Sequence, residues 1–382
     1  MKKKICFVTT SRSDYSLQSI YIKKFNNYKN IDLNLVVSGT HFSKAYGNTY
    51  KLILNDGFKI NKKIKLNINK KKDNLFNINS VFFYEISKYF NKIKPQCIVL
   101  LGDRLEILLT SIVAYTLNIP IIHIGGGELT HGSVDDSYRH AISKMSSIHC
   151  VSNNIYKKRL IRLGENPSNI YITGDPSNEI IKKEKILPKK LLEKKYKIKL
   201  FDKNILFTYH PETSNLGNEK KQITNILKFL ESIEDNFIIF TYPNNDLNAY
   251  IILNEIKKFT KKNKNSILIS NLGRQNYLSF LKHVDLLVGN SSSGLTEAPQ
   301  LGTPTLNIGT RQEGRVMEKS VYNSDSNIKN LQRIYNKIKI KNSKNAFSNI
   351  KLINSLDNFS DNLLNVINNT KNFYIKKKFY EK

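Results

Sequence analysis

The 382-residue chain lacks long apolar runs and has only three cysteines. No uninterrupted apolar stretch approaches the roughly 18 residues that a membrane helix needs, which excludes a spanning protein. The apolar run after Lys2–Lys4 ends within a few residues, too soon for a signal peptide, and indicates a first strand. Cys6, Cys97 and Cys150 are far apart and show no CxxC spacing, which predicts buried thiols rather than disulfides or a zinc site. We therefore expect a cytoplasmic protein.

Arginine is also scarce, because only nine of the 61 basic residues are arginines. With 31 acidic residues the formal charge is +30. The lysines are spread over every surface segment, and no helix-turn-helix, zinc-finger or RNP signature is present, so no nucleic-acid partner is expected. The charge instead favours long-range attraction of an anionic substrate.

Motifs for common cofactors are missing too. Neither GxGxxG nor GxxxxGK[ST] occurs, so dinucleotide and Walker-type sites have no support. His123, His131, His140 and Asp135 match no standard ligand spacing, and no metal site is predicted.

The chain does contain a regular alternation of apolar β-branched runs and segments of helical period. This alternation is typical of parallel sheets covered by helices on both faces. It stops between Gly174 and Leu200, a lysine-rich stretch without strands, and then resumes. We therefore predict an α/β protein with two Rossmann-like domains, residues 1–175 and 200–322, followed by closing helices and a basic tail over 323–382. The expected strands are Lys4–Thr9, Leu33–Ser38, Cys97–Leu101, Pro120–Ile124, Ile148–Val151, Ile170–Thr173, Asn204–Tyr209, Phe237–Thr241, Ser266–Ser270, Asp285–Val288 and Pro304–Ile308.

Unusual residues gather after the expected strands, where open parallel sheets bind ligands. Five of the nine arginines, at positions 12, 104, 139, 311 and 315, fall in or beside these segments. His41, His210 and Asn244 also directly follow expected strands or lie within a few residues of their ends. Two domains with facing strand ends would form a cleft, a usual place for a ligand site.

The segment Gly289–Gly294 joins a strand to an expected helix and consists of Gly, Asn and Ser. Such small residues let N–H groups and hydroxyls approach an anion at the positive end of a helix. Ser291 and Ser292 are thus candidate phosphate contacts. Glu297, expected about a turn and a half into the helix, is a candidate acceptor for a ribose diol. The alternative is that the serines merely cap the helix.

Acidic residues cluster in the first half. Asp103 follows an apolar strand and precedes Arg104, which is expected to hold its carboxylate ionised. Glu128, Asp135 and Asp136 follow within one loop-to-helix segment. Several carboxylates in one cleft can divide acid and base roles. For Asp135 and Asp136 the alternative is simple capping of that helix.

Nine motifs, in order between about residue 3 and residue 322, together resemble the UDP-N-acetylglucosamine 2-epimerase family. The resemblance is strongest to the hydrolysing branch, which makes N-acetylmannosamine for sialic acid or a related sugar for legionaminic acid. The motifs are SRSDY (11–15), SGTH (38–41), LGDR (101–104), HIGGGE (123–128), DDSYRHAISKM (135–145), YHPE (209–212), FTYPNND (240–246), GNSSSGLTEAP (289–299) and NIGTRQEGR (307–315). The resemblance implies a glycosyltransferase-B-like pair of domains, a nucleotide-sugar substrate, no redox cofactor, no membrane insertion, and a homodimer or homotetramer.

The resemblance also assigns roles. Asp103 resembles the carboxylate that acts at the sugar carbons, and Asp135 resembles a second acid/base group. The positions that resemble nucleotide contacts are Arg12, His210, Ser291, Ser292, Glu297 and Arg311. Further substrate-binding candidates, from their places after the strands, are His41, Arg104, Arg139 and Asn244.

One position departs from the family pattern. Several relatives carry a catalytic glutamate where this chain has Gly125. Because glycine transfers no proton, either Glu128 or a loop histidine such as His131 takes that role, or fewer groups act. We predict Glu128 as the third catalytic residue.

The implied reaction converts UDP-N-acetylglucosamine, or a GDP-linked analogue, to a free N-acetylmannosamine-type sugar and the nucleoside diphosphate. It proceeds by elimination of the diphosphate and hydration of the resulting glycal. The context of Arg139 favours this hydrolysing reaction over a non-hydrolysing epimerase. A glycosyltransferase of the same architecture and an inactive nucleotide-sugar-binding protein are further alternatives.

Overall fold

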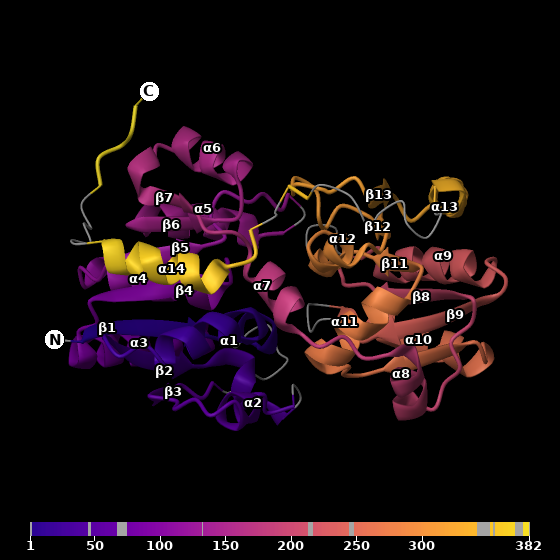
Figure 1. Ribbon diagram of the computed structural model, residues 1–382, viewed down its shortest axis with the longest axis horizontal. Coiled ribbons are helices and arrows are strands. Elements are labelled where there is room, and N and C mark those ends of the chain that lie inside the picture. The colour runs from indigo at the N-terminus through magenta and orange to yellow at the C-terminus, as the bar shows by residue number, and fades with distance from the viewer. Residues whose placement is uncertain are drawn as a thin grey trace. The chain divides into compact units, whose positions relative to one another are not determined.

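The computed structural model describes residues 2–44, 47–66, 75–131, 133–212, 217–243, 248–341, 352–353, 356–370 and 377–381 (Figure 1). The chain divides into two compact units. The first unit comprises Met1–Glu128, Asp135–Ile180 and Leu356–Lys382, and the second comprises Leu129–Val134 and Ile181–Ser355. None of the helices in the described ranges has the length and apolar character that crossing a bilayer requires.

The first unit is built on a seven-stranded sheet in the order β3-β2-β1-β4-β5-β6-β7, with every neighbouring pair parallel. All the strands expected here form, within two residues of their predicted ends. The sequence analysis did not predict β3, because a strand of two residues is too short to show an apolar pattern. The strands are β1 (Lys3–Thr9), β2 (Ile31–Val37), β3 (Lys62–Lys63), β4 (Cys97–Leu101), β5 (Ile121–Ile124), β6 (Ile148–Val151) and β7 (Ile170–Ile172).

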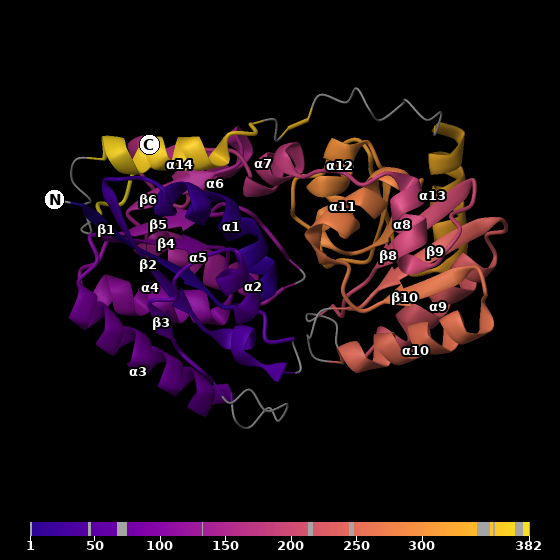
Figure 2. The same cartoon turned by 60° about the horizontal axis from the view of Figure 1, so that its bottom comes forward.

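Helices cover both faces of this sheet, as the continuous apolar strands predict. Helices α1 and α14 lie on one face of the sheet, and α3 and α4 lie on the other (Figure 2). Alternate residues of β1 face the two cores: Ile5 and Phe7 pack with α1 and α14, while Cys6 and Val8 pack with α3 and α4. The three cysteines are buried and unpaired, as predicted. The helices are α1 (Arg12–Asn26), α2 (Tyr50–Asn55), α3 (Leu75–Ile93), α4 (Leu105–Thr116), α5 (Asp135–Met145), α6 (Asn154–Arg162), α7 (Pro176–Lys183) and α14 (Phe359–Asn369).

The second unit repeats the design with a six-stranded parallel sheet in the order β10-β9-β8-β11-β12-β13. Its main core lies between the sheet and α9, α10 and α13. The strands are β8 (Lys203–Thr208), β9 (Asn236–Thr241), β10 (Ser266–Ile269), β11 (Leu286–Gly289), β12 (Thr305–Ile308) and β13 (Val321–Ser324). The helices are α8 (Lys189–Tyr196), α9 (Glu219–Glu231), α10 (Ala249–Lys262), α11 (Gly273–His283), α12 (Glu297–Leu301) and α13 (Ile328–Lys341). The predicted fold class, α/β with two Rossmann-like domains, is confirmed.

The region after β13 contributes to both units. α13 packs on α9 and β13 of the second unit, whereas α14 packs on α1 of the first. Glu179 of α7 binds the first turn of α14, because its Oε2 accepts a 2.6 Å hydrogen bond from the backbone N–H of Ser360. Asn178 Nδ2 donates to the carbonyl oxygen of Leu356 at 3.0 Å. The sequence pattern predicts these helices but not this division between units.

The strand orders locate the expected ligand sites. In each sheet the order reverses between two adjacent strands, β1 and β4 in the first and β8 and β11 in the second. Ligands of open α/β sheets bind beyond the carboxyl ends of the strands at this reversal. Residues 10–15 and 102–104 lie there in the first unit, and residues 209–212 and 290–294 lie there in the second.

Candidate active site

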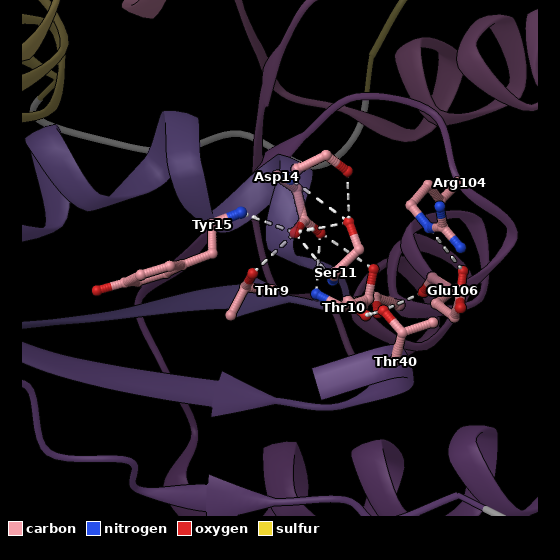
Figure 3. Close-up of polar contacts among 10 residues, drawn as sticks. Thr9, Thr10, Ser11, Asp14, Tyr15, Thr40, Arg104 and Glu106 are labelled. Carbon is pink, nitrogen blue, oxygen red and sulfur yellow. Dashed lines mark hydrogen bonds and ion pairs between the residues drawn. The ribbon is translucent and has the colours of Figure 1, made fainter. Parts of the chain in front are cut away.

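The loop after β1 is organised by one carboxylate (Figure 3). Asp14 is buried, and its oxygens accept six hydrogen bonds from the backbone and hydroxyl groups of residues 9–11 and from the N–H of Tyr15. Ser11 caps α1 in a capping box with Asp14. The positive end of α1 is therefore already occupied by the chain's own carboxylate, and the N–H groups of Thr10 and Ser11 are not presented to a phosphate.

Two sequence-predicted residues adjoin this loop. Arg12 is the first residue of α1; it is exposed, and partial burial of its guanidinium lowers its pKa from the ordinary value. His41 is buried, with Nε2 3.1 Å from Thr9 Oγ1 and Nδ1 2.8 Å from Thr49 Oγ1. Burial lowers the pKa of His41, although Asp14 opposes this. Because both ring nitrogens are engaged inside the unit, His41 braces the loop, and its role in binding stays a prediction.

Asp103 is held by Arg139. The Arg139 side chain is 2% exposed and pairs with the Asp103 carboxylate, while its NH1 donates to Asp136 Oδ1 at 2.9 Å and to the Glu128 carbonyl at 3.0 Å. Burial alone would lower the pKa of Arg139, but the Asp103, Glu128 and Asp136 carboxylates raise it above the ordinary value. A guanidinium supplies several donors in a fixed plane, so one side chain can order this group of oxygens.

Arg104 does not take the role expected of it. Its Nε lies 3.4 Å from Glu106 Oε2, and Glu106, Asp14 and Asp135 raise its pKa. Arg104 has an extended backbone at the start of α4, so its side chain and that of its neighbour Asp103 point to different sides. The expected pairing of Asp103 with Arg104 is wrong, and Arg139 supplies the cation instead.

A buried histidine fixes the backbone next to Asp103. His123 Nε2 lies 2.9 Å from the carbonyl oxygen of Gly102, and Nδ1 lies 3.1 Å from Ser143 Oγ. Burial lowers the pKa of His123 to about 3, so the ring is neutral. A neutral ring that donates from Nε2 accepts at Nδ1, which matches a carbonyl and a hydroxyl as partners. His123 therefore holds the strand end that carries Asp103.

Glu128 lies beside the glycine that departs from the family pattern. A Cβ placed on Gly125 would be 4.0 Å from Glu128 Oε1, so a side chain at position 125 would enter the space near this carboxylate. Gly125 has φ +91°, where side chains are strained. The third predicted acid, Asp135, is the first residue of α5. Its neighbour Asp136 forms an ion pair with Arg139, so its side chain has a role besides capping the helix.

In the second unit, Asn290 joins the ends of β8 and β11. Its Oδ1 accepts from the backbone N–H of His210 at 2.7 Å, and its Nδ2 donates to the His210 carbonyl at 2.9 Å. Arg311 NH1 and Gln312 Nε2 donate to the Asn290 carbonyl at 3.2 and 2.9 Å. Burial, followed by the charge of Arg311, lowers the pKa of His210 well below its ordinary value. His210 and Arg311 are thus brought together by two residues, Asn290 and Gln312, that the sequence analysis did not single out.

The serine segment forms a tight turn rather than the start of a long helix. Residues 292–294 make a single 3-10 turn, and Ser291 Oγ accepts from Ser293 Oγ at 3.1 Å. Tyr277 OH lies 2.5 Å from Ser293 Oγ, so Ser293 faces inward while Ser292 is exposed. Glu297 opens the five-residue helix α12, and the expectation that it lies more than a turn inside a helix is wrong. The small residues favour the turn because Gly294 packs directly on Thr305.

Glu212 closes the same edge of the sheet. Its Oε1 accepts from the backbone N–H of Thr310 at 2.8 Å, and a Cβ on Gly309 would meet that oxygen at 1.9 Å. The segments 209–212, 290–294 and 309–312 therefore converge. Asn244, the remaining predicted contact, lies outside the described residues.

The first unit thus holds Arg12, His41, Asp103, Arg104, Glu128, Asp135 and Arg139, and the second holds His210, Ser291, Ser292, Glu297 and Arg311. Among the described residues, no three His, Cys, Asp or Glu side chains are grouped as a metal site would require.

The chain matches the family model described as UDP-N-acetylglucosamine 2-epimerase over residues 23–357. It is 40% identical to a Campylobacter jejuni protein named GDP/UDP-N,N'-diacetylbacillosamine 2-epimerase (hydrolyzing), over 88% of each chain. It is 32% identical to the UDP-N,N'-diacetylbacillosamine 2-epimerase (hydrolyzing) of Legionella pneumophila, over 89% of this chain and 91% of the relative. The solved UDP-GlcNAc 2-epimerase of Methanocaldococcus jannaschii, in complex with UDP-GlcNAc and UDP, has the same fold at 20% identity, with a TM-score of 0.75 over 96% of this chain and 99% of that one.

The polar segments that converge at the strand ends of both sheets coincide with the motifs that the sequence shares with one family, and the family model extends over most of both units. Identities of 32% and 40% over most of the length show relationship as well as a common fold. The chain belongs to the hydrolysing branch of the UDP-N-acetylglucosamine 2-epimerase family.

Proposed function

We propose that this protein converts a UDP- or GDP-linked 2-acetamido sugar to the free 2-epimeric sugar and the nucleoside diphosphate. The observation that carries the proposal is the 40% identity, over 88% of each chain, to an enzyme named as a hydrolysing 2-epimerase. UDP-N-acetylglucosamine and nucleotide-linked N,N'-diacetylbacillosamine are the two substrates to compare. The product would be N-acetylmannosamine or its substituted analogue, destined for sialic or legionaminic acid.

The first half of the reaction is an elimination. The C2 proton of such a sugar is poorly acidic, so it leaves with or after the diphosphate. The C1–O bond breaks with its electron pair going to the diphosphate oxygen, a carboxylate takes the C2 proton, and a C1–C2 double bond forms. We assign this carboxylate work to Asp103, Glu128 and Asp135. The pairing of Asp103 with Arg139 supports the assignment, and so do Glu128 and Asp135, which lie near enough to Arg139 and Arg104 to raise the pKa values of these arginines.

The second half is a hydration. Water adds hydroxyl to C1 of the glycal, and a protonated carboxyl group returns a proton to C2 on the opposite face, which inverts that carbon. Two or more carboxyl groups are needed, because one face is deprotonated and the other reprotonated.

The second unit would hold the nucleotide. Arg311, Ser291 and Ser292 are proposed to contact the diphosphate, and Glu297 the ribose. His210, neutral at neutral pH, would act as a hydrogen-bond donor or acceptor rather than as a cation. The occupied N-terminus of α1 in the first unit supports this placement of the diphosphate. Arg12 is a further proposed phosphate contact.

A cytoplasmic location and a homodimer or homotetramer are further parts of the proposal. The three buried, unpaired thiols support the location, since a reducing compartment keeps thiols in this form.

Proton NMR of the reaction in deuterated water tests the mechanism. Each candidate substrate is supplied without an acceptor, and the expected products are the free epimeric sugar, carrying deuterium at C2, and the nucleoside diphosphate. A product that keeps its C2 proton would refute elimination and hydration. A nucleotide-linked epimer would indicate the non-hydrolysing reaction, and the absence of any released sugar from either nucleotide would favour a transferase or a binding protein.

A further inference from the structure

Residues 377–381 lie against the first unit, although they fall beyond the range 23–357 that the family model matches. The segment itself therefore lies outside the family match, although it contacts Ser143 and Lys144, which belong to the motif at 135–145. It involves two side chains of this segment, Lys377 and Phe379, and the region of the first unit around the end of α5.

Lys377 contacts the last turn of α5. Its Nζ donates to the carbonyl oxygen of Ser143 at 3.1 Å and to Glu165 Oε2 at 2.6 Å, and its side chain is only 17% exposed. The last carbonyl groups of a helix have no partners within the helix, and the helix dipole places partial negative charge there. The Ser143 carbonyl also accepts from the backbone N–H of Ser146 at 3.1 Å, so the Lys377 ammonium is a second donor to it and opposes that charge.

Phe379, although 65% exposed, and Tyr380 also contact the first unit. A Cβ on Gly164 would lie 2.3 Å from the Phe379 ring, so the ring packs directly on the glycine backbone. The backbone N–H of Tyr380 donates to the Gly164 carbonyl at 3.0 Å, and Lys144 Nζ lies 5.0 Å from the centre of the Phe379 ring. The ring thus receives both a close backbone contact and a cation over its face.

Glu165 is the anchor for this segment. It is 2% exposed, and besides Lys377 it pairs with Lys144 Nζ at 2.8 Å and His149 Nε2 at 2.9 Å. Burial works against the charged form, but hydrogen bonds from His149, Lys144 and Lys377 lower the pKa of Glu165 to about 2. Removing Lys377 alone leaves two partners on Glu165, so such a variant should still fold.

The helix end that Lys377 caps is connected to the candidate active site. Ser143 Oγ holds His123, which in turn holds the carbonyl oxygen next to Asp103. One turn before Ser143, the same helix carries Arg139, the partner of Asp103. A displacement of α5 along its axis would therefore move both supports of Asp103.

We propose that Lys377 and Phe379 form a clasp on the end of α5, and that Lys377 is thereby a positioning residue for the carboxylates ordered by Arg139. The catalytic part of this inference rests on the proposed function, whereas the structural part does not. The clasp contributes no atom to the reaction. It keeps α5, and hence Arg139 and Ser143, in the arrangement that the reaction requires.

The test compares Lys377→Met with Lys378→Met, which removes the same charge from the exposed neighbouring residue. Hydrogen–deuterium exchange of the full-length protein without substrate reports on α5 directly. We expect exchange in the last turn of α5 to rise about ten-fold in Lys377→Met and in Phe379→Ala, and to stay unchanged in Lys378→Met. Equal exchange in all variants would overturn the clasp, whatever the activity of the protein proves to be.

Steady-state kinetics test the positioning role. The concentration of protein able to bind UDP or GDP is first measured by calorimetric titration. The kcat is then calculated from this concentration, so that unfolded protein does not lower it. We expect Lys377→Met to lower kcat about ten-fold with KM nearly unchanged, Lys377→Arg to recover most of the loss, and Lys378→Met to match the wild type. Looser α5 with unchanged kcat would refute the positioning role. Wild-type protein without epimerase activity would instead refute the proposed function and leave the exchange result standing.

Discussion

At the scale of single residues, the buried guanidinium of Arg139 joins oxygen atoms from three segments, namely the end of β4, the glycine loop and the first turn of α5. Charge-assisted hydrogen bonds of this kind are stronger and more directional than neutral ones. A guanidinium, which has several donors in a fixed plane, can bind acceptors in all three segments at once. The catalytic assignments of Asp103 and Asp135 can be tested against this arrangement.

Asp103→Asn and Asp135→Asn should each lower kcat by about two orders of magnitude, because general acid–base groups contribute on that scale. Binding of the nucleoside diphosphate should be nearly unchanged, since neither carboxylate is proposed to contact the phosphates. Asp136→Asn is the matched control, because it also removes a charge from Arg139 but leaves the Asp103 pair intact. Sugar release measures the rates and calorimetry the affinities. If Asp103→Asn and Asp135→Asn retain most of their activity, the site assignment is wrong.

Glu128→Gln should also reduce turnover by about 100-fold if Glu128 supplies the acid/base group missing at position 125. Gly125→Glu should not rescue this variant, because a side chain at φ +91° strains the glycine loop and would crowd position 128. The double variant is compared with Glu128→Gln by sugar release, and thermal unfolding monitors the loop strain. A near-wild-type rate for Glu128→Gln would show that Glu128 only shapes the loop.

Nucleotide binding should depend on the serine segment and on His210. Replacing Ser291 and Ser292 together with Ala, or His210 with Ala, should raise the dissociation constant of the nucleoside diphosphate about ten-fold or more, since hydrogen bonds to charged groups are worth about 1.5–3 kcal/mol. Ser266→Ala, at the opposite end of the strands, is the control. Unchanged calorimetric affinity in both the double serine variant and the His210→Ala variant would place the phosphates elsewhere.

At the scale of elements, each sheet has its polar loops after the carboxyl ends of its strands. The two sheets use different side chains to hold these loops together. In the first unit a helix-capping carboxylate, Asp14, gathers the loop after β1. In the second unit an asparagine side chain, Asn290, and a carboxylate, Glu212, bridge neighbouring loops. Buried polar groups of this kind are stabilising only when fully satisfied, so each loop depends strongly on its central residue.

Asp14→Ala should lower the free energy of unfolding by about 3 kcal/mol, because several buried donors lose a charged acceptor. Asp14→Asn should cost less, since an amide oxygen can still accept from some of them. Ser13→Ala, which changes an exposed residue of the same turn, should be nearly neutral. Urea unfolding of the three variants gives the comparison. Equal stability of Asp14→Ala and Ser13→Ala would show that the loop is held by other contacts.

At the scale of the whole molecule, buried histidines link stability to pH. Burial lowers the pKa values of His41, His123, His149 and His210 from the ordinary value of 6.5. On acidification the unfolded chain therefore binds protons before the folded chain does. The contribution of these neutral histidines to the free energy of unfolding is fully present above pH 6.5. It is lost progressively as the pH falls from 6.5 toward and through the lower pKa values of the folded state.

The free energy of unfolding should consequently be nearly constant from pH 7 to 8 and fall below pH 6.5, by about 1.4 kcal/mol per pH unit for each histidine that stays neutral when folded. His123→Gln should reduce this slope by one histidine's share, because its folded-state pKa of about 3 lies far below that range. Urea unfolding at pH 5, 6, 7 and 8 measures both slopes. Identical slopes would mean that His123 becomes protonated without unfolding the protein.

Much of this protein follows from its amino-acid sequence alone. The eleven predicted strands, their grouping into two parallel sheets and the placement of the polar motifs after the strands depend on periodicity over a few residues, and all are present in the structure. The family was identifiable for the same reason, because its motifs are short, ordered and local.

Tertiary structure alone decided the pairings between distant segments. That Arg139 rather than Arg104 binds Asp103, that Glu128 lies next to Gly125, and that α14 returns to the first unit depend on which strand ends and helix faces meet. Neighbours in sequence, such as Asp103 and Arg104, point apart in an extended backbone, whereas residues 36 positions apart meet because α5 packs beside the end of β4. Local patterns determine the elements, but only the packing of those elements selects the partners of their charged side chains.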